Sequence, residues 1–221
     1  MKINKYIDHT LLKATATKSD IINLCKEAKK YNFYAVCVNG CYVSLAKKQL
    51  ENSNVKVAAV IGFPLGAMST ATKIFEAIDC IKKGASEIDM VINIGKLIDG
   101  DFDYIANEIR QIKEAIGKNV LKVILENCYL NKTQIQKACE LAVIAGADFV
   151  KTATGFGLGG ATLEDVQLMK GIVKDKVLIK AAGGVRDIAT AKKYIAIGVT
   201  RLGTSSGVSL VEKGVSEKNQ Y

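Results

Sequence analysis

Short apolar segments recur along this chain at a nearly constant distance. They are rich in Val and Ile, they alternate with longer amphipathic segments, and their carboxyl ends follow one another every 24 to 37 residues. That distance is about the length of one strand–helix unit. The expected strands are Phe33–Val38, Val55–Ile61, Glu87–Ile92, Val120–Leu125, Asp148–Thr152, Val177–Ala181 and Thr200–Gly203, with Tyr6–Thr10 as an eighth. Eight consecutive units predict an α/β fold of the closed (β/α)8 class, the TIM barrel.

The apolar runs are nearly continuous, which is typical of parallel strands buried on both faces. Helix signals lie between them, including caps at Thr17-x-x-Asp20 and Thr162-x-x-Asp165. Further helices are expected over Ser69–Gly84, Asp101–Gly117, Asn131–Gly146 and Asp187–Gly198. The alternative fold is an open doubly wound sheet, which needs no eighth strand. No linker or low-complexity segment interrupts the chain, so we expect one domain over 1–221, with a polar, mobile tail over 212–221.

Composition narrows the class of protein. The net charge is +9, but the lysines are spread along the chain and there is no tryptophan, so no nucleic-acid-binding signature emerges. Six cysteines without a CxxC pair and a single histidine argue against a zinc ribbon or a disulfide framework. The beginning of the chain lacks a signal-peptide pattern, and no apolar run is long enough to span a bilayer. A cytoplasmic protein without a membrane or specific nucleic-acid partner is therefore expected.

Two lysines stand within apolar strands, Lys151 and Lys180. A lysine in a buried strand is costly because desolvation disfavours its charge. Two such lysines side by side would each lower the pKa of the other, and a Schiff-base nucleophile must be a neutral amine. The pair predicts carbonyl chemistry through an imine. The alternative is that each lysine reaches solvent from a strand end or pairs with a carboxylate.

In a barrel, the carboxyl ends of all strands open on one face, where active sites lie. That face would collect polar residues from distant parts of the chain: Asp8, Cys37, Asp89, Glu126, Lys151 and Lys180. Such convergence predicts an active site, although spacing alone favours core packing for Cys37.

Glycine-rich turns follow the last three strands, at Thr154–Gly157, Gly183–Arg186 and Gly203–Gly207. Glycine lets backbone N–H groups approach an anion closely, and barrel enzymes often hold phosphate in the loops after strands seven and eight. The turns therefore predict a phosphate site, in which Ser205 and Ser206 would add hydroxyl donors. The alternative is that these glycines only allow tight turns.

Several motifs together resemble one family, the class I deoxyribose-phosphate aldolases. The matching stretches are Ile7–Lys13, Ala35–Val38, Gly62–Gly66, Glu87–Asn93, Lys151–Phe156, Lys180–Arg186 and Gly203–Ser206. The resemblance implies a TIM barrel that reversibly cleaves 2-deoxy-D-ribose 5-phosphate to acetaldehyde and D-glyceraldehyde 3-phosphate, in deoxynucleoside catabolism. It implies no metal or organic cofactor, and a homodimer or higher homo-oligomer.

The resemblance also implies roles for individual residues. Lys151 would form the Schiff base, Lys180 would lower its pKa and assist proton transfer, and Asp89 would shuttle protons with Lys180 and a water. The substrate would contact Asp8, Thr10, Cys37, Lys122 and Thr154. The phosphate would contact Gly155, Gly183, Gly184, Ser205 and Ser206. Tyr221, at the end of the tail, would help to move the enamine proton, or the tail would have no role.

Some positions depart from the pattern of the family, namely Ala14, Lys96, Asn127 and Ala153. None replaces a predicted catalytic group, so they bear on substrate preference and not on the reaction. His9 is expected to be a structural residue beside Asp8. Competing functions are another Schiff-base aldolase acting on a different phosphorylated sugar, a non-catalytic phosphosugar-binding barrel, and a basic nucleic-acid binder.

Overall fold

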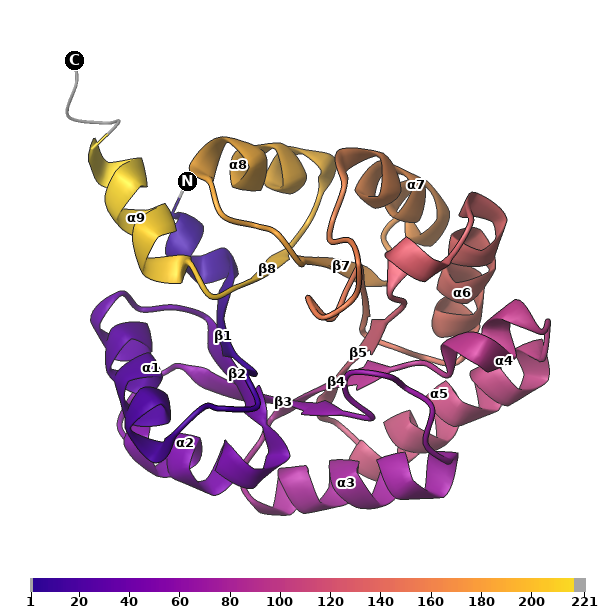
Figure 1. The fold of residues 1–221 in the computed structure, drawn as a ribbon, viewed down its shortest axis with the longest axis horizontal. Helices are drawn as coiled ribbons and strands as arrows, with labels where there is room; N and C mark the ends of the chain where they lie inside the picture. Colours follow the sequence, from indigo (N-terminus) through magenta and orange to yellow (C-terminus); the bar gives the residue numbers. More distant parts are fainter. Residues whose placement is uncertain (1, 217–221) are drawn as a thin grey trace.

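The structure is a computed structural model that describes residues 2–216 of the chain, and it contains a closed barrel of eight parallel strands (Figure 1). Each strand pairs with the next, and β8 pairs with β1. The strands are β1 (Ile7–Leu11), β2 (Ala35–Asn39), β3 (Lys56–Ile61), β4 (Glu87–Val91), β5 (Val120–Ile124), β6 (Phe149–Lys151), β7 (Leu178–Ala182) and β8 (Arg201–Thr204). All eight predicted strands are confirmed, and the open-sheet alternative is wrong.

Helices surround the barrel on its outside (Figure 1). They are α1 (Lys18–Lys30), α2 (Val43–Gln49), α3 (Thr70–Lys82), α4 (Ile94–Ile98), α5 (Phe102–Ile116), α6 (Lys132–Ile144), α7 (Leu163–Val173), α8 (Ile188–Ile197) and α9 (Gly207–Ser216), with 3-10 turns at Ile3–Tyr6, Gly40–Tyr42 and Asn127–Tyr129. The six predicted helices are confirmed as α1, α3, α5, α6, α7 and α8; α9 was not among them, and neither were α2 and α4. Both are short, with seven and five residues, so their hydrophobic periodicity is too brief to read.

Side-chain caps begin the longer helices as the sequence suggests. Thr17 and Asp20 form a reciprocal capping box at α1, while Thr162 accepts only the Asp165 N–H at α7. In α5 the four isoleucines spaced along one face are buried against the barrel. Local sequence therefore fixes where these helices begin and which face they bury.

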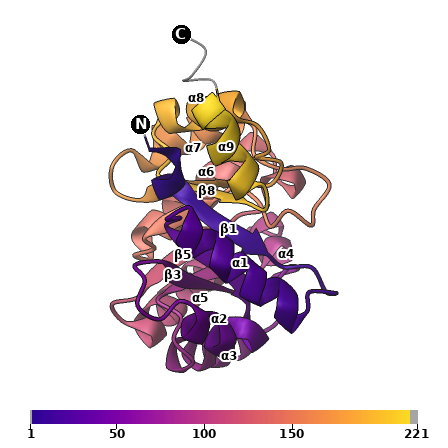
Figure 2. The ribbon, with the colours of Figure 1, turned by 90° about the vertical axis from the view of Figure 1, so that its left-hand side faces the viewer.

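The first part of the predicted tail is helical. Residues 212–216 belong to α9, whose Leu210 is buried in the core and whose Val208 and Val211 pack against it, so apolar contacts extend this helix. Figure 2 shows α9 lying beside the first turn of the chain. Tyr221 lies outside the described residues.

The barrel interior divides into two parts. Successive residues of a strand point to opposite sides of the barrel wall. On β4, Ile88 and Met90 point outward into the main core between strands and helices, whereas Glu87 and Asp89 point into the barrel interior. A small apolar cluster occupies one side of the interior, formed by Leu12, Cys37, Ala58 and Val60, with Phe63 packed against it. The other side is filled by charged side chains, and these build the candidate site.

Candidate active site

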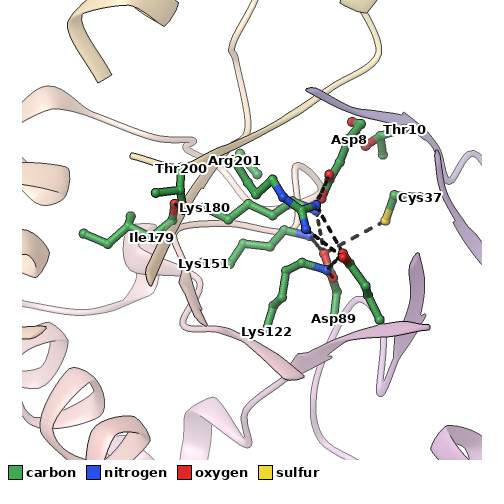
Figure 3. Close-up of polar contacts among 12 residues, drawn as sticks. Asp8, Thr10, Cys37, Asp89, Lys122, Lys151, Ile179, Lys180, Thr200 and Arg201 are labelled. Atoms are coloured by element: carbon green, nitrogen blue, oxygen red, sulfur yellow. Dashed lines mark hydrogen bonds and ion pairs between the residues drawn. The ribbon is translucent and has the colours of Figure 1, made fainter. Parts of the chain in front are cut away.

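Lys151 and Lys180 are direct neighbours in the register of β6 and β7. Both ammonium groups donate to the same atom, Asp89 Oδ2 on β4, at 2.9 and 2.8 Å (Figure 3). All three side chains are almost fully buried. The structure thus brings together the three residues predicted to be catalytic, and it does so around one carboxylate oxygen.

Asp89 and Lys180 belong to a closed ring of buried ion pairs. Going around it, Lys180 contacts Asp8 Oδ2 at 2.5 Å, and Asp8 Oδ1 contacts Arg201 at 2.5 Å. Arg201 contacts Glu87 Oε1 at 2.7 Å, and Glu87 Oε2 contacts Lys122 at 2.6 Å. Lys122 contacts Asp89 Oδ1 at 2.7 Å, which closes the ring. We call these six residues, Asp8, Arg201, Glu87, Lys122, Asp89 and Lys180, the charge ring.

The charge ring favours the ionised forms of Asp8, Asp89, Lys122, Lys180 and Arg201. Burial alone would lower the pKa of Lys180, but Asp8 and Asp89 raise that pKa well above its ordinary value. Burial likewise opposes the charge of Asp8, yet Lys180 and Arg201 lower the pKa of Asp8 to about 2. The pKa of Asp89 also falls well below its usual range, because Lys122, Lys151 and Lys180 outweigh the effect of burial.

This geometry corrects one expectation for the lysine pair. Mutual repulsion was expected to lower the pKa of both lysines, but carboxylates lie between them and the pKa of Lys180 is raised. The expectation failed because lysine spacing gave no information on the two carboxylates that Lys180 contacts. Lys180 is therefore the member of the pair whose positive charge is balanced by two carboxylates.

A cavity of about 370 Å³ opens above the charge ring at the carboxyl ends of the strands. It is lined by Thr10, Leu11, Leu12, Lys13, Lys151, Thr154, Gly155, Phe156, Ala182, Gly183, Gly184, Val185, Arg186, Gly203, Thr204 and Ser205. Lys151 lines this cavity, whereas Lys180, Asp89 and the rest of the charge ring lie beneath its lining. Two of these ring members, Asp8 and Lys122, were predicted to contact substrate. Cys37 was predicted to do so as well, and it is also absent from the lining. Lys151 is thus the buried amine that a molecule in the cavity can reach.

The glycine-rich turns form one end of the cavity. Gly183 has φ +85°, and a Cβ there would lie 2.8 Å from Gly160 Cα, so only glycine fits this close approach. Ser205 lines the cavity, while the backbone N–H of Ser206 donates to Thr204 Oγ1 and Ser206 is not part of the lining. Lys13 and Arg186, two cations that the sequence patterns did not single out for this site, also line the cavity.

Thr154 is held by the buried carboxylate of Glu126. Glu126 accepts the backbone N–H of Thr154 at 3.1 Å and also its hydroxyl, whose oxygen in turn accepts the Phe156 N–H at 3.0 Å. Glu126 adopts φ +56°, a conformation that is rare outside glycine. The hydroxyl proton of Thr154 is thus donated to Glu126, and this contact fixes the loop after β6. Glu126 is not a member of the charge ring, although Glu126, Asp8, Asp89 and Lys180 were predicted to share one face of the barrel.

Two phenylalanines form an apolar wall at the cavity, where Phe156 belongs to the lining and Phe63 packs against it. The Phe63 and Phe156 rings meet edge to face with centroids 5.3 Å apart. Phe63 also packs against the apolar cluster that contains Cys37, whose Sγ lies 4.0 Å from Asp89 Oδ2. Burial raises the pKa of the Cys37 thiol, so the thiol stays neutral beside the charge ring.

Sequence reasoning missed two members of the charge ring, Glu87 and Arg201. Both lie within predicted strands, and a charged residue inside an apolar strand was the available signal, as it was for the two lysines. His9 lies on the outer side of β1, where its Nε2 contacts Glu27 at 2.7 Å, in keeping with a structural role. Within residues 2–216, no group of three or more His, Cys, Asp or Glu residues is arranged to hold a metal, and no helix could span a membrane.

Comparisons with known proteins agree with this geometry. The model of the DeoC/LacD family aldolases matches residues 2–210. A deoxyribose-phosphate aldolase of Finegoldia magna is 56% identical and covers 96% of this chain and 100% of its own length. A deoxyribose-phosphate aldolase of Carboxydothermus hydrogenoformans is 57% identical, and the match covers 97% of this chain and 96% of that protein. The solved structure of the tetrameric deoxyribose phosphate aldolase of Aeropyrum pernix superposes with a TM-score of 0.90 at 31% identity, covering 97% and 92%. The chain therefore belongs to the DeoC/LacD family of aldolases.

Proposed function

We propose that this protein is a class I aldolase that reversibly cleaves 2-deoxy-D-ribose 5-phosphate to acetaldehyde and D-glyceraldehyde 3-phosphate. The observation that carries the proposal is the position of Lys151, a buried amine that shares a carboxylate with Lys180 and reaches a cavity rich in glycine turns. The names of the relatives support the choice of substrate.

The reaction begins at Lys151 Nζ. Its neutral amine adds to the C1 aldehyde of the open-chain sugar, and the carbinolamine loses water to give an iminium ion. Removal of the proton from the C3 hydroxyl lets the C2–C3 bond break, and its electron pair moves into the iminium to form an enamine. Glyceraldehyde 3-phosphate leaves, the enamine carbon takes up a proton, and hydrolysis of the new iminium releases acetaldehyde and restores Lys151.

Asp89 connects Lys151 to the charge ring. Its Oδ2 accepts from Lys151 and Lys180 together, so a positive charge that develops on Lys151 during imine formation is stabilised by a fixed carboxylate. Proton transfers would pass between Lys151, Asp89, Lys180 and water in the cavity. The apolar wall of Phe63 and Phe156 suits the methyl group of acetaldehyde, which has no polar atoms to satisfy.

The phosphate would occupy the glycine-lined end of the cavity. Gly155, Gly183 and Gly184 have positive φ angles and can direct backbone N–H groups at an anion, with Ser205, Lys13 and Arg186 around them. Thr10 also lines the cavity and would contact the sugar hydroxyls. A cytoplasmic location, homo-oligomeric assembly and the participation of Tyr221 and Ser206 stay predictions.

A cleavage assay tests this proposal. Purified protein is given 2-deoxyribose 5-phosphate or unphosphorylated 2-deoxyribose, and both acetaldehyde and the second product are quantified. We expect equimolar products, strong preference for the phosphorylated sugar, and no turnover by Lys151→Met. A protein that binds the phosphorylated sugar without releasing acetaldehyde would contradict the proposal and favour a phosphosugar-binding barrel.

A further inference from the structure

The charge ring contains equal numbers of positive and negative groups. Asp8, Glu87 and Asp89 carry three negative charges, and Lys122, Lys180 and Arg201 carry three positive charges. Each member contacts two partners of opposite sign, so the ring is neutral and closed. Every side chain in it is at most 4% exposed.

Lys151 is a seventh charged group attached to this neutral ring. Among the described residues 2–216, its one carboxylate contact is Asp89 Oδ2, an oxygen that also contacts Lys180. When Lys151 is protonated the buried cluster carries one unbalanced positive charge, and when Lys151 is neutral the cluster is balanced. Unbalanced buried charge is costly because neither water nor a partner ion compensates it.

Arg201 and Glu87 form the part of the ring farthest from the cavity. Arg201 makes two contacts with Glu87, at 2.7 and 3.2 Å, and neither residue lines the cavity. The Tyr34 ring stacks on the guanidinium with its centroid 3.3 Å away, which shields this end from solvent. The pair therefore cannot touch a substrate and acts only through Asp8 and Lys122.

The other titratable groups near Lys151 can be named strand by strand. Asp8 comes from β1, the neutral thiol of Cys37 from β2, Glu87 and Asp89 from β4, Lys122 from β5, Lys180 from β7 and Arg201 from β8. The inward residues of β3 are apolar, Ala58 and Val60. Lys13 and Arg186 line the cavity above, and Glu126 is occupied by Thr154. The ring supplies all the carboxylates among the groups that face Lys151 in the barrel interior.

We propose that Arg201 and Glu87 are positioning residues that complete a neutral ring and thereby make Lys151 the group that gives up its proton. This inference rests on the proposed function, since it concerns the protonation state of the proposed nucleophile. In this account, the charge balance of the ring decides which of the two lysines loses its proton and acts as the nucleophile. Proximity of Lys180 alone does not select it, because Lys180 is itself balanced by two carboxylates.

Charge balance predicts opposite effects for the two residues. Glu87→Gln removes one negative charge and keeps the shape, so the cluster favours neutral Lys151 more strongly. Arg201→Met removes one positive charge, so the cluster favours protonated Lys151. The acid limb of the kcat/KM profile, which reports ionisations of the free enzyme, should move by about one pH unit to lower pH in Glu87→Gln and to higher pH in Arg201→Met. The double variant should return the limb to its original position.

Two control variants separate charge balance from structure. Arg201→Lys keeps the charge and should leave the limb in place, and Glu164→Gln removes an exposed carboxylate outside the barrel and should do the same. The inference would be overturned if the acid limb of the kcat/KM profile moved in the same direction in Glu87→Gln and Arg201→Met. It would also be overturned if the acid limb stayed in place in both variants while kcat fell.

Folding of each variant is checked by circular dichroism. If the single variants do not fold, the acid limb is measured instead for the double variant Glu87→Met/Arg201→Met, in which apolar groups of similar size replace the pair. The inference predicts an unmoved limb for that protein, and a limb moved by about one pH unit would overturn it. A wild-type protein without cleavage activity would instead contradict the proposed function.

Discussion

Lys151 and Lys180 donate to the same oxygen of Asp89, yet only Lys151 lines the cavity. Lys180 has a second carboxylate, Asp8, and the pKa of Lys180 is raised, whereas Lys151 forms no ion pair besides that with Asp89 in the part of the chain that the structure describes. The two lysines are therefore different in kind although their sequence contexts look alike. Lys180 is a buried cation held between two carboxylates, and Lys151 is an amine that a molecule in the cavity can reach.

Removal of Arg186 should weaken binding of the phosphate group specifically. Arg186→Gln deletes a cation from the glycine-lined end of the cavity, so KM for 2-deoxyribose 5-phosphate should rise about tenfold while kcat changes little. Activity on unphosphorylated 2-deoxyribose should be unaffected. Arg110→Gln, on the outer helix α5, is the matched control for net charge. Equal losses on both substrates would show that Arg186 does not contact the phosphate.

The hydroxyl of Thr154 should matter through Glu126. Thr154→Val keeps the shape but leaves Glu126 Oε2 and the Phe156 N–H without their hydroxyl partner, which should cost about 1–3 kcal/mol of stability. The loop after β6 would loosen, and kcat/KM should fall. Thr154→Ser retains the hydroxyl and should resemble the wild type in urea unfolding and in kinetics. A stable Thr154→Val protein with normal kinetics would contradict this role for the contact.

A second buried ion pair holds the outside of β4. Lys73 on α3 donates to Glu108 on α5 at 2.7 Å and to Val91 O at 2.8 Å, and both side chains are fully buried. Lys73→Met leaves the Glu108 carboxylate uncompensated and should destabilise the fold by about 3–5 kcal/mol. Lys73→Met/Glu108→Leu should recover most of this loss in urea unfolding.

The exposed pair Lys83–Asp79 is the control for this measurement. Lys83→Met should leave the free energy of unfolding nearly unchanged, because both side chains are more than 40% exposed and water screens their attraction. If Lys73→Met were no more destabilising than Lys83→Met, the Lys73–Glu108 pair would not hold the helices to β4.

Acid should weaken the charge ring through Asp8. Burial opposes the charge of Asp8, but Lys180 and Arg201 lower its pKa from 3.8 to about 2. A depressed folded-state pKa contributes stability that is present above pH 3.8 and is lost as the pH falls towards 2, a contribution of roughly 2 kcal/mol. The difference in unfolding free energy between wild type and Asp8→Asn should therefore shrink between pH 5 and pH 2.5. A pH-independent difference would contradict this coupling.

The barrel could be predicted from sequence because strand spacing and buried apolar runs are local properties. The predicted neighbours Lys151, Lys180 and Asp89 followed from the rule that strand ends share one face. The charge ring could not be predicted, because its pairs depend on register and barrel closure. Arg201 and Glu87 meet across the interior from strands 114 residues apart in sequence, and no local pattern encodes that contact. Likewise, the sequence could not show that Lys180 contacts two carboxylates.

Trapping of the imine tests the central claim most directly. The protein is incubated with 2-deoxyribose 5-phosphate and sodium borohydride, and the reduced adduct is located by peptide mass spectrometry. We predict a single modified site, Lys151, in the wild type, and a persisting Lys151 adduct in Lys180→Met. A reduced adduct on Lys180, or no adduct on a folded protein that binds the sugar phosphate, would contradict the account.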